Sequence, residues 1–182
     1  AGFSTLENSL YEPEFKFNYS LQLIILALFV LGGIGFPLLF NLYKFLVYYF
    51  KRQLLKLGHP KDAVYLPWVL NLNSRLVLVT TGLLLLFGTG LFYFFEYDNT
   101  LAEHSNFGKF VVSFFGAATP RTAGFNSIDM TALNFSTIMI IFILMWIGAS
   151  PGSTGGGIKT TTFALATLNF LSLARGKDRV EV

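Results

Sequence analysis

Residues 122–125, Thr-Ala-Gly-Phe, are a candidate cation-binding loop, since the chemistry they offer is that of main-chain carbonyl groups. Gly124 can adopt a positive φ, which lets successive carbonyls point in the same direction. Rings of such carbonyls replace the hydration shell of a dehydrated cation. The nearest carboxylate, Asp129, lies outside the centre of the loop, so the site would favour weakly hydrated monovalent ions. A simple tight turn is the alternative for this segment taken alone.

The same pattern occurs twice, which favours an ion-binding loop over a turn. Residues 1–7 (Ala-Gly-Phe-Ser-Thr-Leu-Glu) match 123–129 (Ala-Gly-Phe-Asn-Ser-Ile-Asp) in three identities, then in polar, hydroxyl, aliphatic and acidic positions. Gly-Gly-Ile follows each copy, at 32–34 and at 156–158. Two matches in the same order indicate an internal repeat. The predicted filter residues are Ala1, Gly2, Phe3, Thr122, Ala123, Gly124 and Phe125.

Residues 148–157 predict an irregular segment inside a membrane span. They contain Pro151 and five glycines but no bulky side chain, so a helix cannot continue comfortably through them. Such backbone is tolerated in a membrane only where it lines a cavity or is covered by protein. We therefore expect a movable gate below the filter. The candidate gate residues are Gly148, Ser150, Pro151, Gly152, Ser153, Thr154, Gly155, Gly156, Gly157 and Lys159.

Charged and polar residues flank both segments. Arg121 is expected behind the filter loop, paired with a carboxylate or with carbonyls, since a cation inside a cation filter would oppose its function. An exposed arginine at the outer interface is the alternative. Asn126 and Asp129 are further candidates for filter support. Lys159 either acts on ions at the gate or extends its amine to the membrane interface.

The elements that would position these residues are apolar helices. Roughly 20 apolar residues span a membrane, and residues 19–50, 76–95 and 133–173 are long enough. Residues 107–118 would reach only about 18 Å as a helix, and Pro120 should end that helix near Ala118. We interpret it as a re-entrant pore helix whose negative C-terminal end faces the pore; a helix on the membrane surface is the alternative.

Glycines in the first stretch have a simpler interpretation. Gly32, Gly33 and Gly35 would let helices pack closely, and Pro37 would add a kink. We favour packing and a kink there over any gate.

Composition and charge agree with an integral membrane protein. Of 182 residues, 53% are hydrophobic and 13% are charged, against about 25% charged in soluble domains. Basic residues collect at 51–75 and in the tail at 174–182, and acidic residues at 7–14 and 96–103. Since basic loops mark the cytoplasmic side, we expect 51–75 and the tail to be cytoplasmic in a multi-pass protein of the cell membrane.

No enzyme constellation is apparent. Cysteine is absent, and His59 and His104 would lie on opposite sides of the membrane. Residues 152–160 do not fit the phosphate-binding pattern, because Ile158 separates Gly157 from Lys159. We expect no bound cofactor and no nucleic-acid partner. A membrane scaffold, or a membrane-embedded enzyme that uses the glycines only for packing, is the alternative class.

Two long motifs carry a family resemblance. Residues 119–129 and 147–160 resemble the membrane subunits of the Trk/Ktr/HKT superfamily of potassium transporters, and the Ser-Pro-Gly-Ser-Thr run is most similar to the bacterial Ktr type. The resemblance implies an all-α fold of helix, pore loop, helix repeats, with potassium as the transported ion and sodium as a possible activator or coupling ion. It also implies a homodimeric subunit in membrane lipid, regulated by a cytoplasmic ring of nucleotide-binding subunits.

The resemblance also divides the chain and marks it as a fragment of a four-repeat protein. Residues 1–18 would end the second filter, 19–50 would be the second helix of repeat two, and 51–75 the linker. Residues 76–173 would form repeat three, with pore helix 107–118, filter 119–129 and broken helix 133–173. Two quarter-filters cannot enclose an ion, so this portion alone should not conduct.

Overall fold

The computed structural model describes residues 4–5, 8–58 and 72–176, and all structural statements concern these residues. Within them the secondary structure is helical, apart from one isolated parallel bridge between Ile147 and Ile158. This confirms the predicted all-α class. The elements are η1 (Ser9–Tyr11), α1 (Pro13–Lys16), α2 (Tyr19–Ile34), α3 (Phe36–Gly58), α4 (Leu72–Glu96), α5 (Asn106–Thr122), η2 (Met130–Ala132), α6 (Phe135–Trp146) and α7 (Thr160–Ala174).

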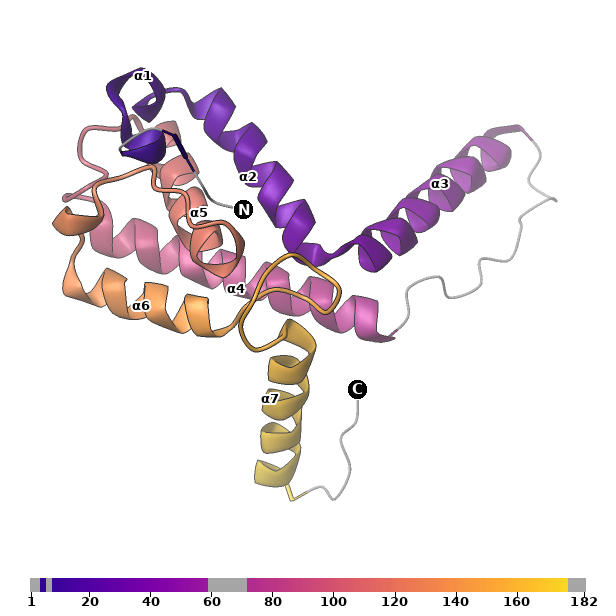
Figure 1. The fold of residues 1–182 in the computed structure, drawn as a ribbon. Helices are drawn as coiled ribbons and strands as arrows, with labels where there is room; N and C mark the ends of the chain where they lie inside the picture. Colours follow the sequence, from indigo (N-terminus) through magenta and orange to yellow (C-terminus); the bar gives the residue numbers. More distant parts are fainter. Residues whose placement is uncertain (1–3, 6–7, 59–71, 177–182) are drawn as a thin grey trace.

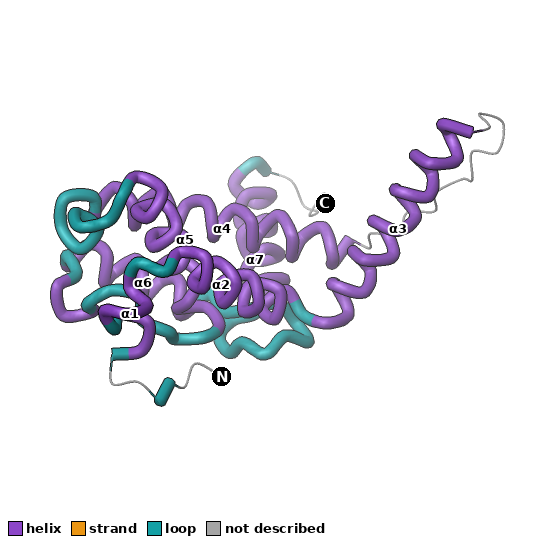
Figure 2. Tube along the Cα trace, turned by 90° about the horizontal axis from the view of Figure 1, so that it is seen from above, coloured by secondary structure: helices purple, strands orange, loops and turns teal. Residues whose placement is uncertain are grey.

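Helix α4 is the central element, and three other helices pack against it. Helix α5 lies between α4 and α2, while α6 and α7 also contact α4. Helix α3 projects away from the rest of the molecule in both Figure 1 and Figure 2. The loop between α6 and α7 passes next to the junction of α2 and α3 (Figure 1). This arrangement brings the two predicted functional segments to the same end of the α2–α5 contact, where Gly33 lies against both Thr122 and Ala149.

Among the described helices, one is long and apolar enough by itself to cross a membrane, namely Asn73–Glu96 within α4. Helices α6 and α7 are apolar but have only 12 and 15 residues. They lie on either side of an irregular segment at 147–159, which interrupts the stretch predicted at 133–173. The helix therefore breaks where proline and the glycines remove both hydrogen-bond donors and helix propensity.

The single span predicted over residues 19–50 is two helices in the structure. The helices α2 and α3 are bent by 103° at their junction, so the kink expected at Pro37 is a full break. Gly35 adopts a φ of 89°, which no regular helix contains. Pro37 has no N–H to donate to the carbonyl of Gly33, so the helical ladder ends there. Helix α3 then continues to Gly58, into the segment expected to be a linker.

The helix predicted over residues 107–118 is also longer than expected, because Pro120 does not end it. Helix α5 runs to Thr122 with Pro120 in its last turn. A proline at this place removes one backbone hydrogen bond. The N–H groups of Ala123 and Gly124 both donate to the carbonyl of Thr119. Eleven of the 17 residues of α5 are buried, and that burial outweighs the local cost. The helix is about 26 Å long, still shorter than a membrane core of about 30 Å.

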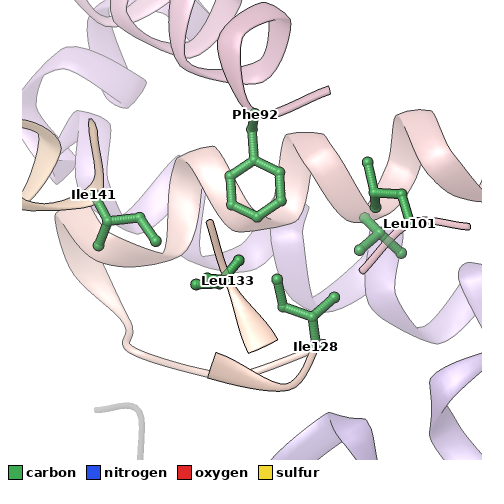
Figure 3. Close-up of a cluster of buried hydrophobic side chains, with 6 residues drawn as sticks. Phe92, Leu101, Ile128, Leu133 and Ile141 are labelled. Atoms are coloured by element: carbon green, nitrogen blue, oxygen red, sulfur yellow. The ribbon is translucent and has the colours of Figure 1, made fainter. Parts of the chain in front are cut away.

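The larger apolar cluster lies at the end of the molecule that holds the loop between α4 and α5 (Figure 3). It joins α4, α5 and α6 to the segment that follows the filter loop, so that segment is anchored by apolar burial. Its members are Phe92, Leu101, Val112, Ile128, Leu133 and Ile141.

Candidate functional site

Small residues allow α5 to lie deep between its neighbours. A Cβ at Gly116 would lie 2.8 Å from the Phe92 ring of α4, and a Cβ at Gly108 would overlap the ring of Tyr19 on α2. Ser105 caps the helix, because its Oγ accepts from the N–H of Gly108 at 3.1 Å. The two glycines therefore allow α4 and α2 to pack closely on α5 from both sides. The helix ends at Thr122, the first residue of the candidate filter 122–125.

The filter loop begins with a sharp turn at Gly124. This residue is exposed and has a φ of 81°, and a Cβ there would meet no atom within 4 Å. The hydroxyl of Thr119 donates to the carbonyl of Phe125 at 2.9 Å. In the described part of the chain, the carbonyls of Ala123 and Gly124 accept no hydrogen bond. They are two oxygen dipoles at the end of a buried helix, on a half-buried and an exposed residue.

The segment after the first repeat copy lies against the second copy. The N–H of Leu10, downstream of the first copy, donates to the carbonyl of Asn126 at 2.9 Å. Leu10 also packs in a buried cluster with Leu26 and Phe115, against which Phe125 lies. The first copy itself, residues 1–3, lies outside the described residues, so the predicted filter positions Ala1, Gly2 and Phe3 have no structural account.

Asp129 supports its own turn and not the filter loop directly. Its Oδ1 accepts from the N–H of Thr131 at 2.9 Å and from the Thr131 hydroxyl at 2.6 Å. These hydrogen bonds lower the pKa of the Asp129 carboxyl below its usual range. The next turn, η2, is therefore capped, and this fixes the segment between the filter loop and α6.

The candidate gate loop is held together by backbone contacts. The N–H of Ala149 donates to the carbonyl of Gly156 at 3.3 Å, and the N–H of Ile158 donates to the carbonyl of Trp146 at 3.1 Å. A Cβ on Gly148 would overlap the carbonyl of Gly156, so only glycine at position 148 allows the two ends of the loop to lie this close. Lys159 folds back on the loop, where its amine donates to the carbonyl of Gly155 at 2.7 Å.

Arg121 connects the end of the pore helix to the gate loop. Its side chain is 7% exposed, and its guanidinium donates to the carbonyl of Gly148 at 3.1 Å and to that of Ile147 at 3.4 Å. Its acceptors are thus carbonyls, and they belong to the start of the gate loop and not to residues 122–125. The two predicted functional segments are in direct contact through this side chain.

Sequence reasoning missed a buried carboxylate at the outer end of α4. Glu96 was assigned to an acidic outer loop, but its side chain is fully buried. Its oxygens accept from the N–H of Asn134 at 2.9 Å and from the hydroxyls of Thr137 and Thr100 at 2.6 and 2.8 Å. Glu96 therefore joins the end of α4 to the start of α6, and no local pattern indicates partners so distant in sequence.

A second outer cluster joins α1 and α2 to the loop before α5. Lys16 pairs with Glu103 at 2.5 Å, and the hydroxyl of Tyr19 lies 3.1 Å from Nδ1 of His104. His104 is buried, at 5% exposed. Burial, with the nearby charge of Lys16 second, lowers the pKa of His104. The hydrogen bond from Lys16 lowers the pKa of Glu103.

In the described segments no three His, Asp or Glu side chains come together as a metal site. Among the described residues, the carbonyls of Ala123 and Gly124 at the end of α5 accept no hydrogen bond. Their chemistry suits the direct coordination of a dehydrated monovalent cation better than a carboxylate-based divalent site.

A buried helix too short to cross a membrane, a glycine turn and a helix interrupted by a glycine-rich segment agree with the predicted class of helical membrane transport proteins. The family described as "TrkH: Cation transport protein" matches residues 1–181. The chain belongs to this family, whose members are transporters and not enzymes.

Relatives with assigned names agree with this family. The chain is 32% identical over 182 residues to the Ktr system potassium uptake protein B of Vibrio alginolyticus, with 99% of the chain aligned. It is 34% identical over 181 residues to the Ktr system potassium uptake protein D of Bacillus subtilis, and 32% over 182 residues to the potassium/sodium uptake protein NtpJ of Enterococcus hirae, with 100% of the chain aligned in both. The chain spans 36% of the length of each of these three relatives.

A solved structure shares the fold. The crystal structure of the potassium transporter TrkH from Vibrio parahaemolyticus superposes with a TM-score of 0.65 at 20% identity. The match covers 100% of this chain and 35% of that one. It confirms the predicted fold of pore-loop helix units and a broken helix.

Proposed function

We propose that this chain forms part of the ion pathway of a membrane protein that takes up potassium. The observation that carries the proposal is the free pair of carbonyls at Ala123 and Gly124, at the C-terminal end of a buried helix too short to span a membrane. Carbonyl dipoles can replace the hydration shell of K⁺, and the partial negative charge of the helix end adds to them. Residues 122–125 are thus the proposed filter of one repeat, and residues 1–3 that of another.

The gate is proposed at residues 148–157 and Lys159. This loop interrupts a membrane helix, contacts the end of the pore helix through Arg121, and is closed on itself by weak backbone bonds. Glycine-rich hinges can absorb the large dihedral changes that opening requires. Arg121, Asn126 and Asp129 are proposed to support the filter, Asn126 through its contact with Leu10 and Asp129 by fixing the turn that follows. Arg121 also joins the filter to the gate.

The names of the relatives support the choice of ion and partners. Three are potassium uptake proteins, and one of these is named for potassium and sodium. We propose K⁺ as the transported ion, with Na⁺ as an activator or coupling ion. The complete subunit would be a homodimer in the lipid of the cell membrane, with residues 51–75 and 174–182 facing the cytoplasm and a ring of nucleotide-binding subunits below.

Rescue of a potassium-uptake-deficient bacterial strain tests the proposal. The complete subunit that carries this segment, expressed with its regulatory partner, should restore growth at low potassium. Deletion of residues 150–156 should then raise K⁺ flux in the absence of the regulatory partner. A lack of rescue would favour a scaffold that uses the glycines for packing, and a deletion variant that stays closed would contradict the gate.

A further inference from the structure

The break between α2 and α3 leaves backbone carbonyls that need partners. The last four carbonyls of a helix have no partner within it, and in a membrane an unpaired carbonyl is costly. Two of these carbonyls are paired by one residue of the gate loop. The N–H of Ser150 donates to the carbonyl of Gly33 at 3.1 Å, and the Ser150 hydroxyl donates to that of Ile34. Ser150 is fully buried.

The fit around this contact requires glycine at Gly35. A Cβ there would lie 3.0 Å from Oγ of Ser150 and 3.2 Å from the carbonyl oxygen of Pro151. The φ of 89° independently disfavours any residue with a side chain. On the other side of the break, a Cβ on Gly152 would lie 3.6 Å from the ring of Pro37. The tip of the loop therefore lies directly on the break.

Helix α3 has few other contacts that would set its direction. It packs mainly on the end of α2 and projects away from the other helices in both views (Figure 1, Figure 2). It then leads toward the basic segment at 51–75. A rotation of α3 about Gly35 would displace the carbonyls that Ser150 binds.

We propose that the α2–α3 break is the seat of the gate loop, so that the direction of α3 and the position of the loop are coupled through Ser150. Gly35 and Ser150 are positioning residues for the gate, and this role rests on the proposed gate at 148–157. In the seated state both carbonyls are paired and the loop stays in the pathway. When α3 turns, the two bonds break and the loop is released.

The coupling can be measured as a distance in the complete subunit, independently of transport. Spin labels at Glu14→Cys in α1 and Tyr43→Cys in α3 report the bend between α2 and α3, and this chain has no cysteine of its own. The Ser150→Ala variant should broaden and shift the distance distribution measured by pulsed electron paramagnetic resonance. Ser153→Ala is the control, because the hydrogen bond that its hydroxyl donates goes to the carbonyl of Ser150 within the loop, at 2.5 Å, and not to α2.

A second pair of variants tests the seat from the side of α2. Gly35→Ala should shift the same distance, while Gly82→Ala, where a Cβ meets no atom within 4 Å, should leave it unchanged. Unchanged distances in both Ser150→Ala and Gly35→Ala would overturn the inference.

Potassium flux measured without the regulatory partner separates this inference from the gate itself. With coupling and gate both correct, Ser150→Ala should raise that flux about tenfold, the factor that 1.4 kcal/mol represents. A shifted distance with unchanged flux would uphold the coupling and contradict the gate. A raised flux with an unchanged distance would uphold the gate and overturn the coupling.

Discussion

A terminal nitrogen of the Arg121 guanidinium lies 3.1 Å from the carbonyl oxygen of Gly148. One buried cation at the end of the pore helix therefore holds the first residue of the proposed gate. The backbone of Arg121 also lies close to the loop, because a Cβ on Gly155 would lie 3.1 Å from the Arg121 carbonyl oxygen. The proposed filter and gate are neighbours in space although 23 positions separate Phe125 from Gly148 in the sequence.

Arg121→Lys should lower the midpoint of thermal unfolding of the complete subunit. Lysine keeps the charge but lacks the planar fork that reaches both Ile147 and Gly148. The loss of a charged hydrogen bond in a buried place costs about 1.5–3 kcal/mol. Fluorescence-detected unfolding of the purified protein checks this. Arg175→Lys, at an exposed position after α7, is the control, and equal effects of the two would contradict the role of Arg121.

Gly124→Ser should weaken selectivity for K⁺ over Na⁺ by about tenfold. No atom lies within 4 Å of the added Cβ, so the effect comes from the backbone and not from a clash. A side chain in the left-handed region costs roughly 1–2 kcal/mol, which would turn the adjacent carbonyls. Competitive flux of the two ions measures the change. Gly90→Ser, in helical α4 with equal free space, should leave selectivity unchanged, and unchanged selectivity in Gly124→Ser would remove the filter assignment.

Glu96→Gln should destabilise the complete subunit by about 1.5–3 kcal/mol for each strong hydrogen bond to the charged carboxylate that is lost. The amide is similar in size, but its NH₂ group would face a donor, either the Thr137 hydroxyl or Asn99. Thermal unfolding measures the effect. Glu14→Gln, at an exposed position of α1, should shift the midpoint far less. A comparable shift would contradict a stabilising role for the buried carboxylate of Glu96.

Acidification should destabilise the outer end of the molecule through His104. An unfolded histidine binds a proton near pH 6.5, whereas burial lowers the pKa of His104 in the folded state. The unfolded state therefore binds more protons below pH 6.5, and stability falls as the pH is lowered from there through the folded pKa. Lys16, Glu103 and Lys109 are the charged groups around the ring.

Unfolding midpoints of the complete subunit between about pH 7.5 and 5.5 check this prediction. The His104→Gln variant should show a flatter dependence than the wild type in that range. Glu103 affects stability only at lower pH. Its pKa is lowered in the folded state, so the stabilisation it provides is lost as the pH falls below about 4.3, the pKa of an unperturbed glutamate. Parallel curves for wild type and His104→Gln would contradict the assignment to His104.

The sequence predicted the elements that backbone chemistry dictates. A proline followed by successive glycines interrupts a helix in any surroundings, so the break at 147–159 was predictable. The same holds for the turn at Gly124, since a glycine after a short apolar helix can adopt positive φ. These are local properties of the chain, and they were sufficient to indicate the fold class and the family.

Only the tertiary structure decided which groups are buried and which partners they have. Pro120 stays within α5, which packs between α2 and α4. At the break beside Gly35, the carbonyls of Gly33 and Ile34 find their partner in Ser150, more than 110 positions away in the sequence. Glu96 and His104 resemble ordinary loop residues in the sequence, yet both are buried. Hydrogen bonds and burial between distant segments are set by packing, which local propensity does not encode.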